Sequence, residues 1–245
     1  MPHKTEDPIS DAEWRKLRTD TATLYEERDY AGALSNAEAA VEAATAAYGK
    51  RSQEAAQSLG DLGQLHETQG KYLSALSAYQ QALAIREKVL APGPPDLILA
   101  LENLARAHLA MGLPAQAEPF YRRALEAAQA TLGGDHIGTA TTIDNLGNTL
   151  RELGRYAEAE ELHQQAMAIK ERVFGTDHPQ LAGSLDNLGD DHMAQGQAAQ
   201  AQWFYEQSLE LRESTTGEDR PEIAQSLHRL ANAHFAQGDV AAAAA

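Results

Sequence analysis

The stretch SLDNLGDDHMAQGQ, residues 184–197, places Gly189 in the middle of a pattern that otherwise predicts a helix. Four other stretches have the same form: SLGDLGQLHETQGK (58–71), ALENLARAHLAMGL (100–113), TIDNLGNTLRELGR (142–155) and SLHRLANAHFAQGD (226–239). Successive stretches lie 42 residues apart, without insertion or deletion. The chain is therefore built from a repeat, and the fold follows from that repeat.

Three columns of the repeat predict its first helix and the turn after it. Leucine or isoleucine stands three residues apart in two columns, at Leu59, Leu101, Ile143, Leu185 and Leu227, and at Leu62, Leu104, Leu146, Leu188 and Leu230. This spacing is typical of one helix face. A glycine column follows and predicts a turn with positive φ: Gly70, Gly112, Gly154, Gly196 and Gly238.

A further column holds only glycine or alanine inside the predicted helix: Gly63, Ala105, Gly147, Gly189 and Ala231. Glycine in a helix interior costs about 1 kcal/mol relative to alanine. Its recurrence in one register predicts that a larger side chain there would push two helices apart.

The second helix of each unit carries alanine and an aromatic residue in register: Ala75, Ala117, Ala159 and Ala201, then Tyr79, Tyr121, His163 and Tyr205. The recurring tyrosines are expected in the core. Units are predicted at about 13–49, 55–91, 97–133, 139–175 and 181–217, with a partial unit at 223–245 and a tail at 1–12. In the first unit Arg28 stands where the turn glycine should be.

These residues resemble the tetratricopeptide repeat, whose general pattern is followed by Leu59, Leu62, Gly63, Tyr79 and Ala82. The 42-residue period and the phrases AMAIKERVFGTDHP and LDNLG are similar to the kinesin-light-chain type of this repeat. The resemblance implies an all-α fold: a right-handed superhelical solenoid of antiparallel helix pairs spanning residues 13–245. It also implies a concave groove, lined by the first helices, that binds peptides.

The resemblance places two ladders of polar residues in that groove. An asparagine ladder, Asn103, Asn145 and Asn187, matches positions at which the family holds a ligand backbone. An amide supplies both a donor and an acceptor to a peptide unit. The alternative is a hydrogen bond from asparagine to a neighbouring helix.

The second ladder is acidic: Glu102, Asp144 and Asp186, with Asp190 one turn further along. It either attracts lysine or arginine of a bound segment or forms a solvated helix face. Asp191 is expected to turn toward the flank. The groove candidates also include Arg106, Asn148 and Arg151, and the two arginines are alternatively partners of the acids. Further positions that the resemblance places in the groove include Gly60, Asp61, Gln64, Glu67 and Gly183.

The net charge of −16 argues against nucleic-acid binding, because such binding depends on basic residues. Basic segments are the electrostatically favoured partners, although an acidic surface also simply confers solubility. No run of about 18 apolar residues predicts a membrane span, and the lack of cysteine makes a cytoplasmic location the default.

No cofactor, metal site or catalytic motif is predicted, so the chain is not expected to be an enzyme. Histidines recur in one register at His66, His108, His192 and His234. Leucine replaces them in other repeats, and whole-repeat spacing is too wide for one zinc ion, so a packing role is expected. His136 and His178 are expected to cap helices or face solvent.

The sequence thus predicts a scaffold that binds an extended protein segment, with a basic segment favoured. Two alternatives stay open. The incomplete sixth unit leaves Leu227, Leu230 and Phe235 without a covering helix, so two copies could associate there. The chain could also be the sensory or autoinhibitory region of a larger signalling protein or enzyme.

Overall fold

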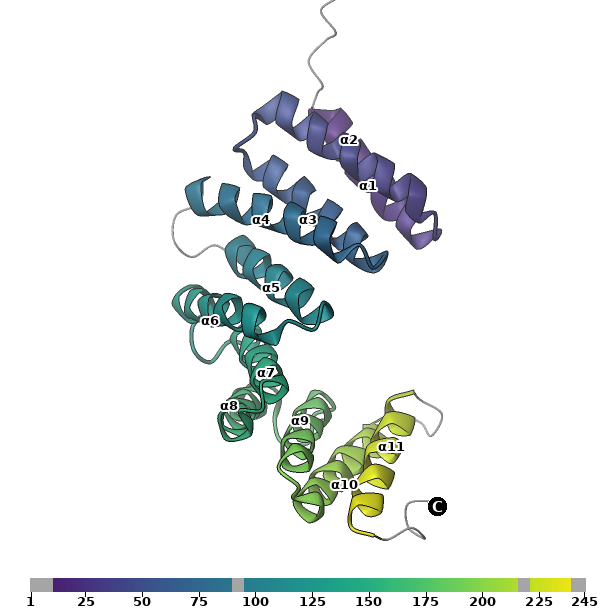
Figure 1. The fold of residues 1–245 in the computed structure, drawn as a ribbon, viewed down its shortest axis with the longest axis vertical. Coiled ribbons are helices and arrows are strands. Elements are labelled where there is room, and N and C mark those ends of the chain that lie inside the picture. Colours follow the sequence, from purple (N-terminus) through teal and green to yellow (C-terminus); the bar gives the residue numbers. More distant parts are fainter. Residues whose placement is uncertain (1–10, 90–94, 216–220, 239–245) are drawn as a thin grey trace, which may run out of the picture. The chain divides into compact units, whose positions relative to one another are not determined.

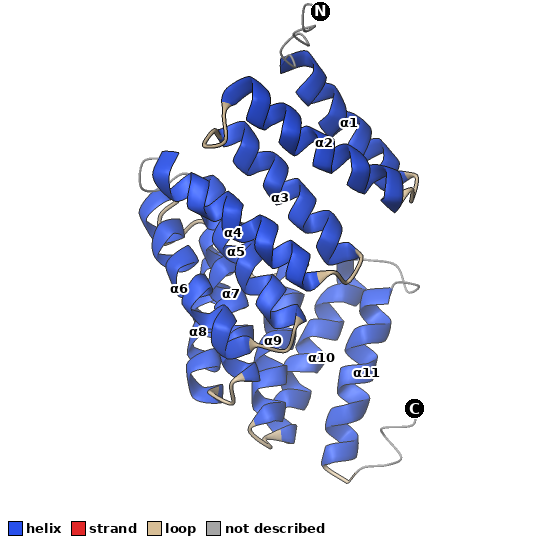
Figure 2. Cartoon of the chain, turned by 45° about the horizontal axis from the view of Figure 1, so that its top comes forward, coloured by secondary structure: helices blue, strands red, loops and turns tan. Residues whose placement is uncertain are grey.

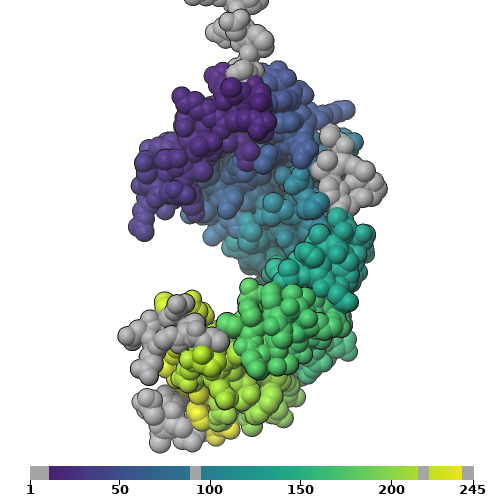
Figure 3. All heavy atoms as spheres, turned by 180° about the vertical axis from the view of Figure 1, so that it is seen from behind, coloured from purple at the N-terminus to yellow at the C-terminus, as the bar shows by residue number. Residues whose placement is uncertain are grey.

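The computed structural model describes residues 11–89, 95–215 and 221–238; the remaining residues are grey in Figure 3. Every regular element in these ranges is a helix (Figure 2). The predicted all-α class is therefore confirmed for the described part of the chain. The helices are α1 (Asp11–Glu26), α2 (Tyr30–Tyr48), α3 (Gln53–Thr68), α4 (Tyr72–Val89), α5 (Pro95–Ala110), α6 (Pro114–Thr131), α7 (Ile137–Glu152), α8 (Tyr156–Phe174), α9 (Gln180–Ala194), α10 (Ala198–Thr215) and α11 (Pro221–Ala236).

The chain divides into two compact units, residues 1–127 and 128–245. In the first, α1 packs on α2, α2 on α3, α3 on α4 and α4 on α5, so that consecutive antiparallel helices stack in chain order (Figure 1). In the second, α7 to α11 stack in the same way. The helices of each stack therefore pack against their neighbours in the sequence, as repeat proteins do.

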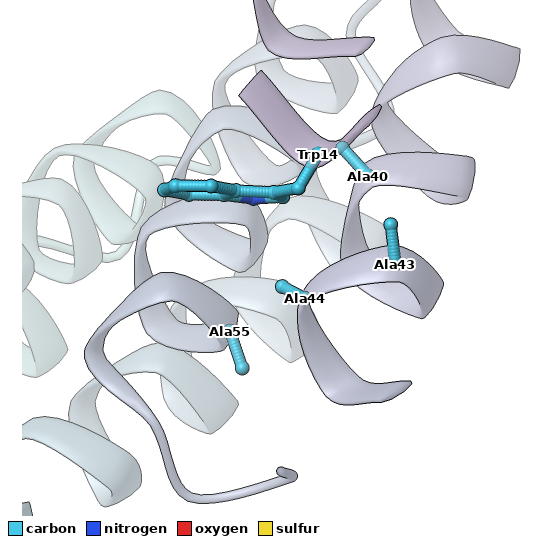
Figure 4. Packing of buried hydrophobic residues seen from close by; sticks show 5 residues of the cluster. All are labelled: Trp14, Ala40, Ala43, Ala44 and Ala55. Carbon is cyan, nitrogen blue, oxygen red and sulfur yellow. The ribbon is translucent and has the colours of Figure 1, made fainter. Parts of the chain in front are cut away.

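Small residues bring these helices close together. In the first unit, Trp14 of α1 packs among Ala40, Ala43 and Ala44 of α2 and Ala55 of α3 (Figure 4). The indole Nε1 of Trp14 donates a hydrogen bond of 2.8 Å to Ser58 Oγ. One large ring thus fills the space that the alanines leave, and its polar atom is satisfied.

The question raised by Gly189 has a direct answer in the second unit. A Cβ atom on Gly189 would lie 2.4 Å from Cε1 of Tyr205, far inside van der Waals contact. Gly63 faces Tyr79 in the same way, and Gly147 faces His163. The predicted close approach is confirmed, and it occurs between this small residue and the aromatic residue of the second helix.

The predicted turns are confirmed by backbone geometry. The turn glycines all have positive φ: Gly70, Gly112, Gly154, Gly196 and Gly238. Arg28, which replaces the turn glycine in the first repeat, adopts φ of 64° at the equivalent position. The repeat therefore imposes the left-handed conformation even on a residue that disfavours it.

The last described helix, α11, leaves apolar side chains exposed. Leu227 is 49% exposed and Phe235 is 68% exposed, as the sequence predicts. The prediction for Leu230 is wrong, because this side chain packs against the cluster formed by Tyr205, Ala201 and Ala233.

Candidate functional site

The acidic ladder of the second unit is paired with cations from the same unit. Asp144 of α7 is 8% exposed, and its Oδ2 accepts a hydrogen bond of 2.5 Å from Lys170 Nζ of α8. Lys170 also donates to Ser184 Oγ of α9 at 2.8 Å. The charge of Asp144 is thus neutralised within the chain, and the pair ties three successive helices together.

Asp186 repeats this arrangement in the next 42-residue repeat of the same unit. It is 3% exposed, and its Oδ2 lies 2.7 Å from Nη2 of Arg212 in α10 and 3.2 Å from Nη1 of Arg229 in α11. Arg212 also bonds to Ser226 of α11. The alternative of a solvated helix face does not hold for Asp186, because the side chain is buried and pairs with two guanidinium groups.

Asp190 lies at the edge of the same cluster. Its Oδ1 accepts from the Tyr205 hydroxyl at 2.7 Å and from Arg229 Nε at 3.2 Å, and its Oδ2 lies 3.8 Å from Arg151 Nη2. Burial and the adjacent Asp190 carboxylate raise the pKa of Tyr205 above its usual range. The hydroxyl therefore remains a donor and holds Asp190 in place.

Asp191 is wholly buried, so the prediction that it turns toward the flank is wrong. Its Oδ2 lies 2.5 Å from Nδ1 of His163, and its Oδ1 accepts from Arg151 Nη1 at 3.2 Å. His163 Nε2 lies 3.3 Å from the carbonyl oxygen of Asp144. The ring thus lies between the Asp191 carboxyl group of α9 and a backbone carbonyl of α7, and links the two helices.

Arg151 and Asn148 belong to the same network. Arg151 Nη2 donates to Asn148 Oδ1 at 2.7 Å, and Nη1 also reaches the backbone oxygen of Asn187 at 3.4 Å. The alternative that Arg151 pairs with the acids is therefore what the structure shows. Its charge holds α7 and α9 together.

The side-chain amides of Asn145 and Asn187 behave differently. Both residues are half-buried on the first helices α7 and α9. Within the described residues neither amide forms a hydrogen bond, although the acids beside them all do. The alternative of an amide bonded to a neighbouring helix is thus not observed, and both amides retain their donor and acceptor.

In the first unit Arg106 is also paired. Its Nε lies 2.8 Å from Oε1 of Glu67, and the Tyr79 hydroxyl donates to Oε2 at 2.8 Å. Burial raises the pKa of Glu67, but the hydrogen bonds from Arg106 and Tyr79 outweigh it and leave the pKa below its usual range. Of the other candidates in this unit, Glu102 is half-buried and Asn103 is 8% exposed.

The first repeat contributes polar residues that are not among the positions predicted above. A hollow of about 270 Å³ between α1 and α3 is lined by Arg18, Tyr25, Asp61 and Gln64, among others. Arg18 Nε lies 2.7 Å from Asp61 Oδ2. Arg18 and Tyr25 stand 42 residues before the predicted groove positions Gly60 and Glu67, so the same register would have identified them.

The recurring histidines pack as expected. His108 stacks on Phe120 with ring centroids 5.6 Å apart, and His192 stacks on Phe204 at 5.2 Å. Burial lowers the pKa of His108 below its usual range. His136 and His178 cap helices, each accepting a backbone N–H two residues on.

In the described ranges, no group of three or more histidine, aspartate or glutamate side chains is arranged to hold a metal ion. Among the helices described, none combines the length and apolar character needed to cross a membrane.

The family follows from these repeats and their packing. The sequence model described as "Tetratricopeptide repeat" matches residues 22–88, 96–172, 142–214 and 180–245. The chain belongs to the tetratricopeptide repeat family. A search of curated proteins found no match.

Solved structures show the same fold. A Podosopora anserina protein assigned as a kinesin light chain, with nearly identical TPR-like repeats, is 26% identical, with a TM-score of 0.67 over 77% of this chain and 89% of that chain. BtubC (BKLC) from P. vanneervenii is 21% identical, with a TM-score of 0.69 over 94% and 87%. A Rap protein complexed with Competence and Sporulation Factor is 16% identical, with a TM-score of 0.64 over 94% and 72%. The predicted likeness to kinesin-light-chain repeats is confirmed.

Proposed function

We propose that this protein is an interaction scaffold, and that the first-helix face of its second unit holds an extended segment of a partner through Asn145 and Asn187. The observation that carries the proposal is that these two amides, alone among the polar ladder positions of α7 and α9 named above, have no hydrogen bond within the described chain. An amide pair matches the donor and acceptor of a peptide backbone. The Rap complex shows that a protein of this fold binds another factor.

We propose that the partner presents an extended segment, as the sequence predicts, but that this segment need not be basic. Asp144, Asp186 and Asp190 already have lysine or arginine partners in the chain. A cation on a bound segment would have to compete with these partners, two of which are largely buried. Recognition through amides depends on backbone geometry, so we propose that the side-chain charge of the segment matters little on this unit.

Catalysis has no place in this proposal. A cytoplasmic setting remains part of it, because a chain without cysteine gains nothing from an oxidising compartment.

The test uses peptides selected from a random display library on the full chain. The double variant Asn145→Ala/Asn187→Ala is expected to weaken binding of a selected peptide by about tenfold or more, as the loss of two amide contacts predicts. Fluorescence anisotropy measures the affinity. The matched control is Asn36→Ala, a half-buried asparagine on the second helix α2, which should leave the affinity unchanged. Equal affinities for the double variant and the wild type would refute the proposal.

Self-association is a second candidate function, favoured by the exposed face of α11. Leu227 is 49% exposed, whereas its counterparts in the second to fifth repeats, Leu59, Leu101, Ile143 and Leu185, are 8% exposed or less. We propose that a second copy covers Leu227 and Phe235. Sedimentation equilibrium should then show dimers that the variant Leu227→Gln/Phe235→Gln lacks. A wild-type chain that stays monomeric at high concentration would exclude this function.

A further inference from the structure

In the second unit the cations that pair with Asp144 and Asp186 occupy the same position of the repeat, on its second helix. Lys170 of α8 and Arg212 of α10 stand 42 residues apart, and each binds the aspartate of its own repeat, Asp144 or Asp186. Each also bonds to a serine of the next first helix, Ser184 or Ser226. The same column places Arg86 in α4 of the first unit.

Arg86 lacks both of these partners. Gly60 stands where the aspartate would be, and Ala100 stands where the serine would be. Arg86 is nevertheless 5% exposed, and its Nε has no hydrogen-bond partner. Among the residues that the structure describes, no acid forms an ion pair with it. A buried guanidinium without a counter-ion is energetically unfavourable, so the position is incomplete as it stands.

The nearest acids do not complete it. Asp61 is held by Arg18 at 2.7 Å, and Asp96 accepts a hydrogen bond of 3.0 Å from Gln53. Burial lowers the pKa of Arg86, and the charges of Asp96 and Asp61 offset this only in part. Both carboxylates therefore interact with Arg86 only by electrostatic attraction at a distance, without a hydrogen bond.

There is room for a carboxylate beside Arg86. A Cβ atom on Gly60 would lie 3.9 Å from Arg86 Nη2, which is ordinary van der Waals distance, and would meet no other atom within 4 Å. Gly60 is half-exposed and belongs to the predicted groove positions, so a ligand can approach it from the first-helix face. In the second unit Arg229 of α11 also contacts Asp186. The equivalent position in α5 of the first unit is Asn103, so no second cation occupies that place beside Arg86.

We propose that Arg86 binds a carboxylate supplied by a partner, namely the side chain of an aspartate or glutamate in a segment lying on the first-helix face of the first unit. Two repeats of this chain already bind an aspartate carboxylate with the cation of this column. The net charge of −16 repels a strongly acidic segment, so the site suits a single acidic residue. This inference rests on the proposed scaffold function, because it names part of what the partner presents.

The test observes Arg86 directly in the full ¹⁵N-labelled chain. The arginine Nε–Hε signal lost in Arg86→Lys identifies the group, and the probes are acetyl-Ala-Glu-Ala-amide and its glutamine counterpart. The glutamate peptide should shift this signal saturably, with an affinity about tenfold or more above that of the glutamine peptide. Inorganic phosphate is titrated separately. An equal response to both peptides, no response, or a response to phosphate alone would overturn the proposal.

Gly60→Asp supplies the missing carboxylate from the chain itself. It should abolish the response to the glutamate peptide, whereas Gly183→Asp, at another helical groove glycine with open space around it, should retain it. Circular dichroism confirms that both variants are folded, and Arg86→Met removes the response without adding a charge. Persistence of the response in Gly60→Asp would contradict the site.

The two proposals fail separately. If the glutamate peptide does not shift Arg86 while Asn145→Ala/Asn187→Ala loses its selected peptide, only the Arg86 site is wrong. If the shift occurs while the double variant binds normally, only the proposed role of the asparagines is wrong.

Discussion

The two units follow one register but treat their buried charges differently. In the second unit Lys170 and Arg212 each hold an aspartate of their own repeat. In the first unit Arg86 occupies the same column and faces Gly60 instead. A repeat therefore preserves its packing while the residues opposite the cation decide whether that cation stabilises the fold or remains available to a ligand.

The largest expected effect comes from breaking a completed pair in the second unit. Asp186→Asn leaves Arg212 and Arg229 adjacent without their shared carboxylate. Removing one partner of a buried ion pair costs about 3–5 kcal/mol of the free energy of unfolding. Urea denaturation measures this loss. The control Asp177→Asn, at an exposed acid in the loop before α9, should cost less than about 0.5 kcal/mol. Similar values for the two variants would mean that the pair is dispensable.

The second prediction concerns the contact between a helix glycine and a tyrosine ring, which occurs in both units. Gly63→Ala and Gly189→Ala should each lower the free energy of unfolding by about 1–3 kcal/mol, because the new Cβ would overlap a tyrosine ring. Gly183→Ala is the control, since nothing lies within 4 Å of its added Cβ. It should raise stability by up to about 1 kcal/mol, the gain in helix propensity. Thermal and urea unfolding decide between these signs, and a stabilised Gly189→Ala would contradict the close approach.

The sequence predicts those features that depend on register alone. A 42-residue step places the Leu188 and Gly189 columns on a helix, the Gly196 column in a turn, and the Tyr205 column in the core. Each follows from helix periodicity or from the conformational freedom of glycine, which are local properties. The structure confirms them even for Arg28.

The site was less predictable because its pairs join different helices. The acidic ladder consists of first-helix residues, whereas its counter-ions Lys170 and Arg212 come from second helices. A signal was nevertheless present. Histidine replaces tyrosine only at position 163, and the next repeat places Asp191 in a column otherwise filled by Thr23, Leu65, Ala107, Thr149 and Ala233. The two exceptions pair with each other. The roles of Asn103 and Glu102, and one continuous solenoid over residues 13–245, stay predictions.

The third prediction uses pH to examine a completed pair in the first unit. The folded-state pKa of Glu67 is lowered, so its ionised form stabilises the protein above its unfolded pKa, and this contribution is lost as pH falls. Glu67→Gln should therefore cost about 1–2 kcal/mol at pH 7. The difference from the wild type should shrink as pH falls below about 4.5. Urea titrations between pH 7 and pH 3 measure it, and a difference that is constant with pH would exclude ionic pairing with Arg106.

The most direct test asks whether an aspartate at position 60 pairs with Arg86 as Asp186 pairs with Arg212. A double-mutant cycle combines Gly60→Asp with Arg86→Met and measures the free energies of unfolding of the wild type, both single variants and the double variant. A favourable coupling of about 1 kcal/mol is predicted for a pair whose one end is half-exposed. A coupling within about 0.3 kcal/mol of zero would contradict the claim that position 60 lies within reach of an incomplete cation.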